Sequence, residues 1–227
     1  LYTYNLHEKV INHIDDIGTD NDRNITRISA NSHSSVGNYI HASSILEKYI
    51  SSKISPDRQV ELELLELYLK FKDTDFTEEY INSLLIKDPD NSDTLFSISR
   101  MLHERGFYDL SEKYLSFIVV ENDRVNILRG LNDYMLNNYA ESIDHFERVN
   151  DFNYKIMAFV NIASSLNKIY GFEKAFNYLE NQRNIHDDKE VKLNMALNQI
   201  SLLNENDRYD EVIAFCNKLL KLEPQST

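Results

Sequence analysis

Cysteine, glycine and proline are scarce in this sequence of 227 residues. Only one cysteine is present, so an intramolecular disulfide cannot form. The 5 glycines and 3 prolines leave few positions for turns with special backbone geometry, which disfavours a β-sandwich or a β-barrel. The hydrophobic share of 42% and the charged share of 27% are those of an ordinary folded protein. The scarcity of turn residues therefore favours a helical fold.

Long apolar runs and a targeting segment are also missing. The apolar runs are short, such as 117–120, and fall far below the roughly 20 residues of a membrane-spanning helix. Residues 1–10 lack the basic start and apolar middle of a signal peptide. Because the chain begins at Leu1 and not at methionine, we expect a segment to precede it in the full protein. We therefore expect a soluble protein and leave its compartment open between cytoplasm and periplasm.

Positive charge is in deficit. The 24 lysines and arginines against 37 acidic residues give a net charge of −13, which would repel a phosphate backbone. This balance disfavours nucleic acid as a partner, and the short apolar runs disfavour direct insertion into a membrane. It favours a protein or peptide segment that is neutral or basic.

Prolines and aromatic residues recur with a period near 34. Pro56 and Pro89 are 33 residues apart, and Pro224 follows after four further intervals of similar length. Aromatic or similar residues recur at intervals of 31 to 37, namely Tyr39, Thr74, Tyr108, Tyr139, Phe172 and Tyr209. A period near 34 is typical of stacked helix pairs.

Each recurring residue has equivalent neighbours. Three residues later stand mostly small side chains, which are Ala42, Thr77, Ser111, Ser142, Ala175 and Val212. Four residues further on stand the apolar Leu46, Ile81, Leu115, Phe146, Leu179 and Cys216. Nine residues before each recurring position stand Ala30, Leu65, Ser99, Gly130, Ala163 and Ile200. These spacings place the residues on one helical face, with the small side chains where another helix comes close.

This pattern resembles the tetratricopeptide repeat (TPR) family, most clearly at 105–111 and 130–146. The resemblance implies an all-α, right-handed solenoid of antiparallel helix pairs. We expect six repeats over 23–57, 58–91, 92–122, 123–155, 156–192 and 193–227, with a partial repeat or helix over 1–22. Gly37 and Gly106 would lie in the turn between the two helices of a repeat. Stacking of neighbouring repeats would build the core.

Residue patterns for catalysis are weak. The seven histidines are scattered without metal-ligand spacing. Cys216 falls at an expected core position, which favours a buried apolar role. Ser165 and Lys168 match S-x-x-K, but the motifs that accompany it in acyl-transfer enzymes are missing. We therefore expect no enzyme activity, no cofactor and no metal.

The resemblance implies a partner-binding groove lined by the first helix of each repeat. Carried over to this sequence, its candidate residues are Arg27, Asn31, Glu66, Lys70, Phe96, Arg100, His103, Tyr134, Asn167 and Lys168. One TPR subset grips a C-terminal carboxylate with Lys, Asn and Arg side chains. Here Glu66 replaces the central asparagine and would repel a carboxylate, so we reject this clamp. Phe96 instead favours an apolar anchor for an extended segment or an amphipathic helix.

Repeat four departs from the pattern, with Arg129 and Asp133 where apolar residues are expected. The simpler interpretation is an ion pair within the helix. The alternative is a rotated helix that turns Ile127, Leu131 and Tyr134 into the groove. We expect partner contacts to concentrate on repeats two to four, where Phe96, Arg100 and Tyr134 would converge.

These features indicate a non-catalytic protein-interaction scaffold or adaptor that binds a peptide or helix segment in its concave groove. Both ends of the array resemble cut ends, so we expect a fragment of a larger protein, with ends open to homo-oligomer formation. The abundance of asparagine, isoleucine, lysine and tyrosine indicates an AT-rich coding genome, which favours a bacterial source. In bacteria such arrays serve envelope assembly, secretion or polysaccharide export, so we expect a role of this kind. Two alternatives stay open. They are the regulatory domain of a peptide-sensing transcription factor, and the substrate-positioning module of a larger enzyme.

Overall fold

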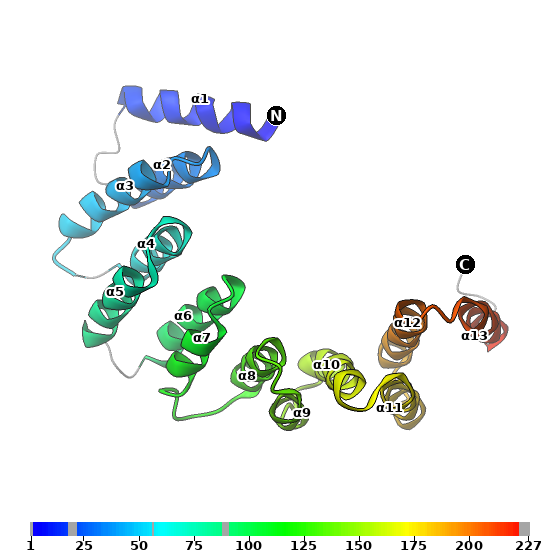
Figure 1. Cartoon of the computed structure of the whole chain (residues 1–227). Coiled ribbons are helices and arrows are strands. Elements are labelled where there is room, and N and C mark those ends of the chain that lie inside the picture. The colour runs from blue at the N-terminus through cyan, green and yellow to red at the C-terminus, as the bar shows by residue number, and fades with distance from the viewer. Residues whose placement is uncertain (1, 18–21, 56, 88–90, 223–227) are drawn as a thin grey trace. The chain divides into compact units, whose positions relative to one another are not determined.

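The computed structural model describes residues 2–17, 22–55, 57–87 and 91–222. Within these ranges every regular element is an α-helix (Figure 1). None of the helices in these ranges is both long and apolar enough to cross a membrane. The all-helical fold predicted from the repeat period is confirmed.

The chain divides into two compact units, Leu1–Gly106 and Phe107–Thr227, which we call unit 1 and unit 2. The helices of unit 1 are α1 (Tyr2–Ile17), α2 (Arg23–Ser35), α3 (Tyr39–Ser51), α4 (Arg58–Phe71), α5 (Thr74–Lys87) and α6 (Ser92–Glu104). Those of unit 2 are α7 (Tyr108–Leu115), α8 (Asp123–Met135), α9 (Tyr139–Glu147), α10 (Phe152–Tyr170), α11 (Phe172–Ile185), α12 (Lys189–Glu205) and α13 (Tyr209–Leu222). The border between the two units, after Gly106, falls inside the third predicted repeat, 92–122. The division into units therefore does not test the predicted repeat boundaries, which stay a prediction.

The even-numbered helices α2 to α12 are called first helices below, and the odd-numbered helices α3 to α13 second helices. Each of the six recurring positions found in the sequence is the first residue of a second helix. The residue two positions earlier has a positive φ at Gly37 (87°), Gly106 (83°), Asn137 (66°) and Asp207 (57°). Glycine tolerates this left-handed backbone best, and asparagine and aspartate tolerate it better than other residues. The predicted turns at Gly37 and Gly106 are therefore confirmed.

Every first helix starts with the same kind of cap. An aspartate or asparagine side chain accepts hydrogen bonds from backbone N–H groups of the first turn, and these residues are Asp22, Asp57, Asn91, Asn122, Asp151 and Asp188. Such a cap satisfies donors that the helix itself leaves without partners. Each polar segment between predicted repeats therefore ends at its aspartate or asparagine cap, because the next first helix begins directly after that residue.

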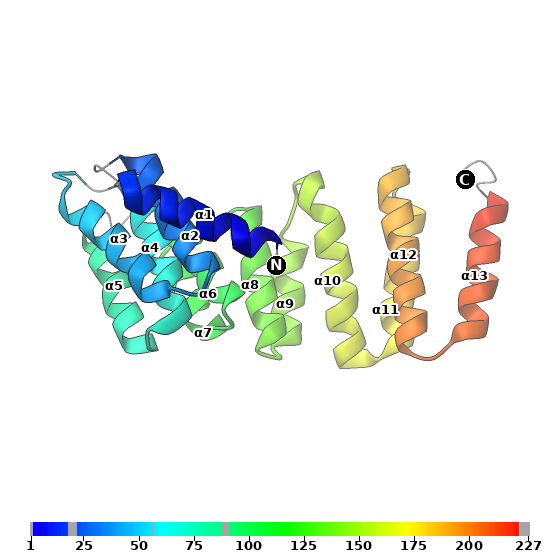
Figure 2. The same ribbon diagram turned by 90° about the horizontal axis from the view of Figure 1, so that it is seen from above.

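In unit 2 the first helices form one layer, because α8 contacts α10 and α10 contacts α12. The second helices α9 and α11 each lie between two first helices along the chain, so α9 contacts both α8 and α10. Figure 2 shows α10, α12 and α13 next to one another, with α11 behind α12. Unit 1 repeats this arrangement, with α3 in contact with α2 and α4, and with α4 in contact with α6.

The small positions predicted from the sequence are where helices meet. Four of these small residues are fully buried, namely Ala42, Ser111, Ser142 and Ala175. The apolar residues four positions after a small residue are fully buried as well at Leu46, Ile81 and Leu115. The core of unit 2 includes one cluster around Phe146 and Ile162 and another around Leu179 and Met195. Burial of each large apolar side chain contributes about 1.5–3 kcal/mol, which stabilises the stack.

Cys216 does not reach the core position that the pattern predicts, because it is only half-buried. Leu115 and Leu179, which occupy the same position in earlier repeats, are buried. Ala175, the small residue on the same helix as Leu179, is buried too. α12 follows and contacts α11, whereas no described helix follows α13. The repeat pattern predicts the face of a side chain, but burial also needs a neighbour on that face.

Candidate partner-binding site

The ten candidate residues predicted from the sequence all lie on first helices. Arg27 and Asn31 belong to α2, Glu66 and Lys70 to α4, and Phe96, Arg100 and His103 to α6. Tyr134 belongs to α8, and Asn167 and Lys168 to α10. Phe96 and Arg100 are in unit 1 and Tyr134 is in unit 2. Their convergence therefore stays a prediction.

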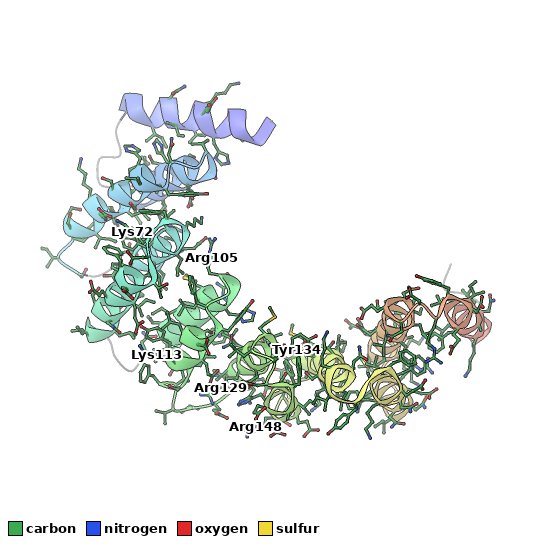
Figure 3. The ribbon with its side chains drawn as sticks, viewed as in Figure 1. Lys72, Arg105, Lys113, Arg129, Tyr134 and Arg148 are labelled. Atoms are coloured by element: carbon green, nitrogen blue, oxygen red, sulfur yellow. The ribbon has the colours of Figure 1, made fainter. Side chains whose placement is uncertain are left out.

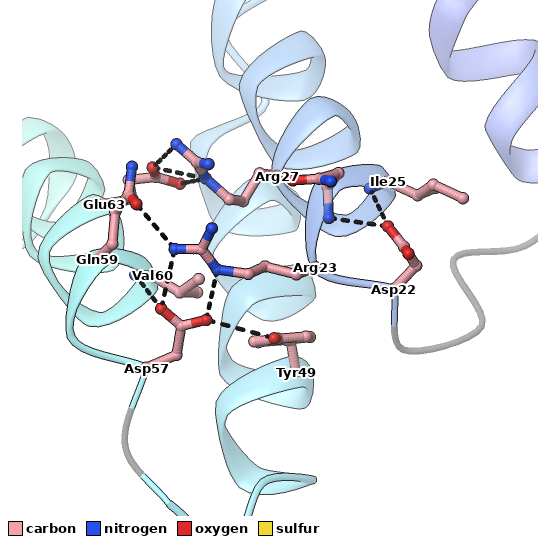
Figure 4. Close-up of polar contacts among 10 residues, drawn as sticks. Asp22, Arg23, Ile25, Arg27, Tyr49, Asp57, Gln59, Val60 and Glu63 are labelled. Carbon is pink, nitrogen blue, oxygen red and sulfur yellow. Dashed lines mark hydrogen bonds and ion pairs between the residues drawn. The ribbon is translucent and has the colours of Figure 1, made fainter.

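Two arginines of α2 are paired with carboxylates at the start of α4 (Figure 4). Arg23 donates from Nε to Asp57 Oδ2 at 2.7 Å and from Nη2 to Gln59 Oε1 at 2.8 Å. Arg27 donates from Nε to Glu63 Oε1 at 2.8 Å. The hydrogen bond from Arg23 is the main cause that lowers the pKa of Asp57. These contacts hold α2 to α4 and occupy the Arg27 guanidinium.

Lys70 is also engaged within unit 1. Its Nζ lies 3.6 Å from Glu66 Oε1 and donates to Ser34 Oγ at 3.2 Å. Arg105 Nη2 lies 4.0 Å from the same Glu66 oxygen. Along α6, Arg100 Nη1 lies 2.6 Å from Glu104 Oε1. The charged candidates of unit 1 therefore have partners inside the chain, while the Asn31 side chain is exposed.

The predicted ion pair between Arg129 and Asp133 does not form. Arg129 Nη1 lies 2.8 Å from Glu121 Oε1, and Nη2 donates to the Leu115 carbonyl at 3.1 Å. Asp133 Oδ2 lies 3.5 Å from His145 Nε2 on α9. The helix α7 ends at Leu115, and this end presents the carbonyl to which Arg129 reaches. The prediction is wrong because both side chains find partners on neighbouring elements.

The titratable groups around α8 have shifted pKa values. Burial is the main cause that raises the pKa of Glu112, whose Oε1 lies 3.4 Å from Arg129 Nε. Burial also raises the pKa of Asp133. It lowers the pKa of His145, and the Asp133 carboxylate acts in the opposite direction. His145 is therefore mostly neutral at neutral pH, so its contact with the Asp133 carboxylate is not a full ion pair.

The alternative of a rotated α8 is also wrong. Ile127 is buried in the cluster around Phe146, and Leu131 packs against that cluster. Tyr134 is half-buried, and its ring centroid lies 5.4 Å from that of Tyr139. Tyr134 alone of the three reaches the surface hollow described next.

A hollow of about 110 Å³ lies on unit 2 beside α10. Tyr134 of α8, labelled in Figure 3, lies at one side of it. The other lining residues are Val160, Ala163, Ser164, Asn167, Lys168, Leu179, Asn198, Ser201, Leu202 and Glu205. Three of the candidate residues, Tyr134, Asn167 and Lys168, are thus brought together around one hollow.

The lining combines buried apolar side chains with polar and charged ones. Ala163, Leu179 and Leu202 are buried in the core cluster between α10, α11 and α12. Neither Lys168 nor Glu205 forms an ion pair with any described residue, in contrast to the charged candidates of unit 1. A hollow of this kind offers polar groups whose partners must come from water or from a ligand.

The lining residues on α12 were not predicted. The 37 residues that separate Phe172 from Tyr209 also separate Ser164 from Ser201, and Lys168 from Glu205. Equivalent positions of the predicted repeats five and six therefore line the same hollow. Applying the repeat period to the polar residues of α10 would have found them.

Among the described side chains, no group of three or more histidine, cysteine, aspartate or glutamate residues is placed to hold a metal ion. His33 is buried, and its ring centroid lies 4.3 Å from that of His41. This pair is a packing contact between α2 and α3.

Sequence comparison finds no matching family model and no matching curated protein. Solved structures with a similar fold do exist. PilF from Pseudomonas aeruginosa is similar with a TM-score of 0.54 at 18% identity, over 90% of this chain and 93% of that one. PilW, a type IV pilus biogenesis factor, gives 0.54 at 15% identity, over 89% and 94%.

A tetratricopeptide repeat protein from Parabacteroides merdae gives a TM-score of 0.57 at 12% identity, over 97% of this chain and 86% of that one. Identities this low establish the fold alone. The helix pairs, their turns and their small contact residues agree with that similarity. The chain therefore has the fold of the tetratricopeptide repeat proteins.

Proposed function

We propose that this chain is a protein-interaction scaffold without catalytic activity of its own, which holds a segment of a partner protein against its first helices. Stacked helix pairs present long surfaces that bind other proteins, and this use of the fold supports the proposal. PilW, which has a similar fold, is a pilus biogenesis factor. This likeness supports assembly at the cell envelope among the roles that we propose, which also include secretion and polysaccharide export.

The observation that carries the proposal is the hollow on unit 2. Side chains from three successive first helices, α8, α10 and α12, line it, and its charged rim residues have no ion-pair partner among the described residues. An intramolecular core would pair or exclude such groups. A surface that leaves them available is suited to a ligand that crosses several repeats.

The candidate residues contribute to this surface in different ways. Arg27, Glu66, Lys70 and Arg100 form ion pairs within unit 1, so a partner would have to compete for them. Asn31, Tyr134, Asn167 and Lys168 are the candidates with the least engaged polar groups. Phe96 and His103 are half-buried and supply contact area.

The charge of the whole chain limits the choice of partner. A net charge of −13 attracts neutral or basic segments more readily than acidic ones. This steering acts mainly on the rate of association and weakens as salt shortens the screening length. We therefore expect a partner segment that is neutral or basic.

The proposal is tested by affinity capture from an extract of the cells that produce the protein. The bait is the wild-type chain, or Phe96→Ala, Arg100→Ala or Tyr134→Ala, each with an unchanged melting temperature. Lys174→Ala is the control, since this residue is exposed on the second helix α11. We expect at least one first-helix variant to lose a protein that wild type and Lys174→Ala retain. Retention of all partners by the three first-helix variants, with loss in Lys174→Ala, would contradict the proposal.

A further inference from the structure

Large apolar side chains are exposed at or next to the links that join one helix pair to the next. In unit 2 they are Val119, Phe152 and Ile185, with exposed fractions of 92%, 52% and 69%. Successive members of this set are 33 residues apart, which is the repeat period. In unit 1, Ile54 and Ile86 are exposed at their own links, 32 residues apart. A single exposed apolar residue is ordinary, but stacked repeats turn equivalent residues into a row.

The links of unit 2 lie along one edge of its stack of helices. Figure 2 shows the turns from α10 to α11 and from α12 to α13 at the lower edge of that view, so the links before α10 and α12 lie at the opposite edge. The links before α8 and α10 are in direct contact, because the Asn150 N–H donates to Asp123 Oδ2 at 3.2 Å. We call Val119, Phe152 and Ile185 the edge row.

Val119 is held outward by its neighbours in the link. Ile118 is buried, and its N–H donates to the Leu115 carbonyl at 3.0 Å. On the other side of Val119, Glu121 Oε1 lies 2.8 Å from Arg129 Nη1. Because the link is fixed on both sides, the exposed side chain is already in place for a ligand, which lowers the entropy cost of binding.

The spacing of the links fits a helix better than an extended segment. Helices in contact lie about 8–10 Å apart, and α8 contacts α10 as α10 contacts α12, so successive links are roughly 10 Å apart. Residues seven apart on a helix share a face and are separated by about 10.5 Å. Residues on one face of an extended chain recur about every 6.6 or 13 Å, which does not match this spacing.

The edge that carries the row is acidic. Within 116–124, 147–153 and 185–190, seven residues are acidic and three are basic. Ion pairs to Arg129 and Lys192 neutralise two of the acidic groups, and a negative surplus remains. Such an edge attracts a basic segment and repels both an anionic membrane and a second copy of itself.

We propose that the edge row binds a basic amphipathic helix of a partner protein, whose apolar side chains, seven residues apart, contact Val119, Phe152 and Ile185. Phe117 and Val120, which are also exposed, extend the apolar contact beside Val119. The edge row shares no residue with the hollow beside α10. The inference therefore goes beyond the proposed function and does not depend on it.

The probe is a fluorescein-labelled helical peptide of about 21 residues, long enough for three leucines that are seven positions apart. The other positions are alanine and lysine. A control peptide of the same composition has its leucines five positions apart, which places them on different faces of the helix. Binding of each peptide to the full chain is measured by fluorescence anisotropy.

The test variant replaces the whole edge row, as Val119→Thr, Phe152→Gln and Ile185→Gln. The matched control replaces three similarly exposed residues at or near the opposite edge, as Tyr170→Gln, Tyr209→Gln and Ile213→Gln. Circular dichroism checks that both variants melt as wild type does. Val119→Thr alone is a second test variant, because this side chain is too exposed for the change to disturb the fold.

We expect wild type to bind the probe roughly tenfold more tightly than the control peptide, or better. The test variant should lose about tenfold or more in affinity for the probe, because each methylene removed from water changes affinity about fourfold. Val119→Thr alone should lose about fourfold, and the opposite-edge control should stay within about twofold of wild type. Added salt should weaken binding of the probe.

Equal affinity of wild type for the two peptides, or of wild type and the test variant for the probe, would overturn the inference. Failure of the probe to bind would overturn it too. Two further results would assign the edge to another ligand and have the same consequence. One is flotation of wild type, but not of the test variant, with phosphatidylcholine vesicles. The other is a dimer in analytical ultracentrifugation that the test variant does not form. The capture of partner proteins by first-helix variants decides the proposed function separately.

Discussion

Phe146 leaves no room for a side chain on Gly130. A Cβ atom built on Gly130 would lie 2.8 Å from both Cε1 and Cζ of the Phe146 ring. The ring is 1% exposed and belongs to the core cluster that joins α8, α9 and α10. It therefore cannot move aside without disturbing its neighbours.

Gly130→Ala should destabilise the protein by about 1–2 kcal/mol. Overpacking costs about 1–3 kcal/mol, and replacing a helical glycine by alanine regains up to about 1 kcal/mol. Urea unfolding followed by circular dichroism measures the difference. In a double-mutant cycle, Phe146→Leu should relieve part of the loss caused by Gly130→Ala. A Gly130→Ala variant as stable as wild type would show that the two helices are not in this close contact.

Ala175→Arg should destabilise the fold by more than about 3 kcal/mol. Ala175 is 0% exposed where α11 meets its neighbours, so the arginine would bury a charge without a partner. Asn177→Arg is the matched control, because Asn177 is exposed on the same helix. We expect the control to change the free energy of unfolding by less than about 0.5 kcal/mol. Similar melting temperatures for the two variants would contradict the assignment of the buried face.

Much of the fold follows from local rules that a sequence displays. The start of each second helix could be predicted from positions such as Tyr39 and Tyr139, because a turn and the next helical face are set within a few residues. The buried faces followed for the same reason, as at Ala42 and Ala175.

The predictions were weaker where a side chain chooses among partners from different elements. The spacing of Arg129 and Asp133 predicts an ion pair within α8, but Arg129 instead bonds to the Leu115 carbonyl at the end of α7 and pairs with Glu121. No spacing along α8 contains this information. The hollow beside α10 depends likewise on three first helices. The repeat period locates Ser201 and Glu205, but it does not show that a hollow forms beside them.

Stability should fall as the pH drops from 7.5 to 5.5, partly because of His145. Burial lowers the pKa of His145 below its ordinary value of 6.5 in the folded state. The unfolded chain then binds a proton at higher pH than the folded chain does, so acidification through 6.5 favours unfolding. The charged groups near this ring are Asp133, Arg148, Arg129 and Glu121.

The measurement is urea unfolding of wild type and His145→Gln at both pH values. His145→Gln removes the titrating group, so we expect its loss of stability to be smaller than that of wild type by a few tenths of a kcal/mol. An equal loss in the two proteins would show that His145 titrates alike in the folded and unfolded chains.

Duplex DNA should not bind to the chain at moderate salt. The net charge of −13 repels phosphates, and non-specific binding depends on lysine and arginine contacts with them. In a mobility-shift assay we expect no shift below a protein concentration of about 100 μM, near the weak end of non-specific affinities. A shift at low micromolar concentration would contradict the charge argument.

The central claim is that a partner protein binds to the first helices of this fold, and site-specific photo-crosslinking in the producing cells tests it most directly. The photo-reactive residue p-benzoyl-phenylalanine is introduced at one position at a time. Two positions, Tyr134 and Lys168, lie beside the hollow, and two controls, Asp144 and Lys174, lie on the second helices α9 and α11. The account predicts crosslinks to a partner protein from positions 134 and 168, and none from 144 and 174. Crosslinks from positions 144 and 174 alone would contradict it.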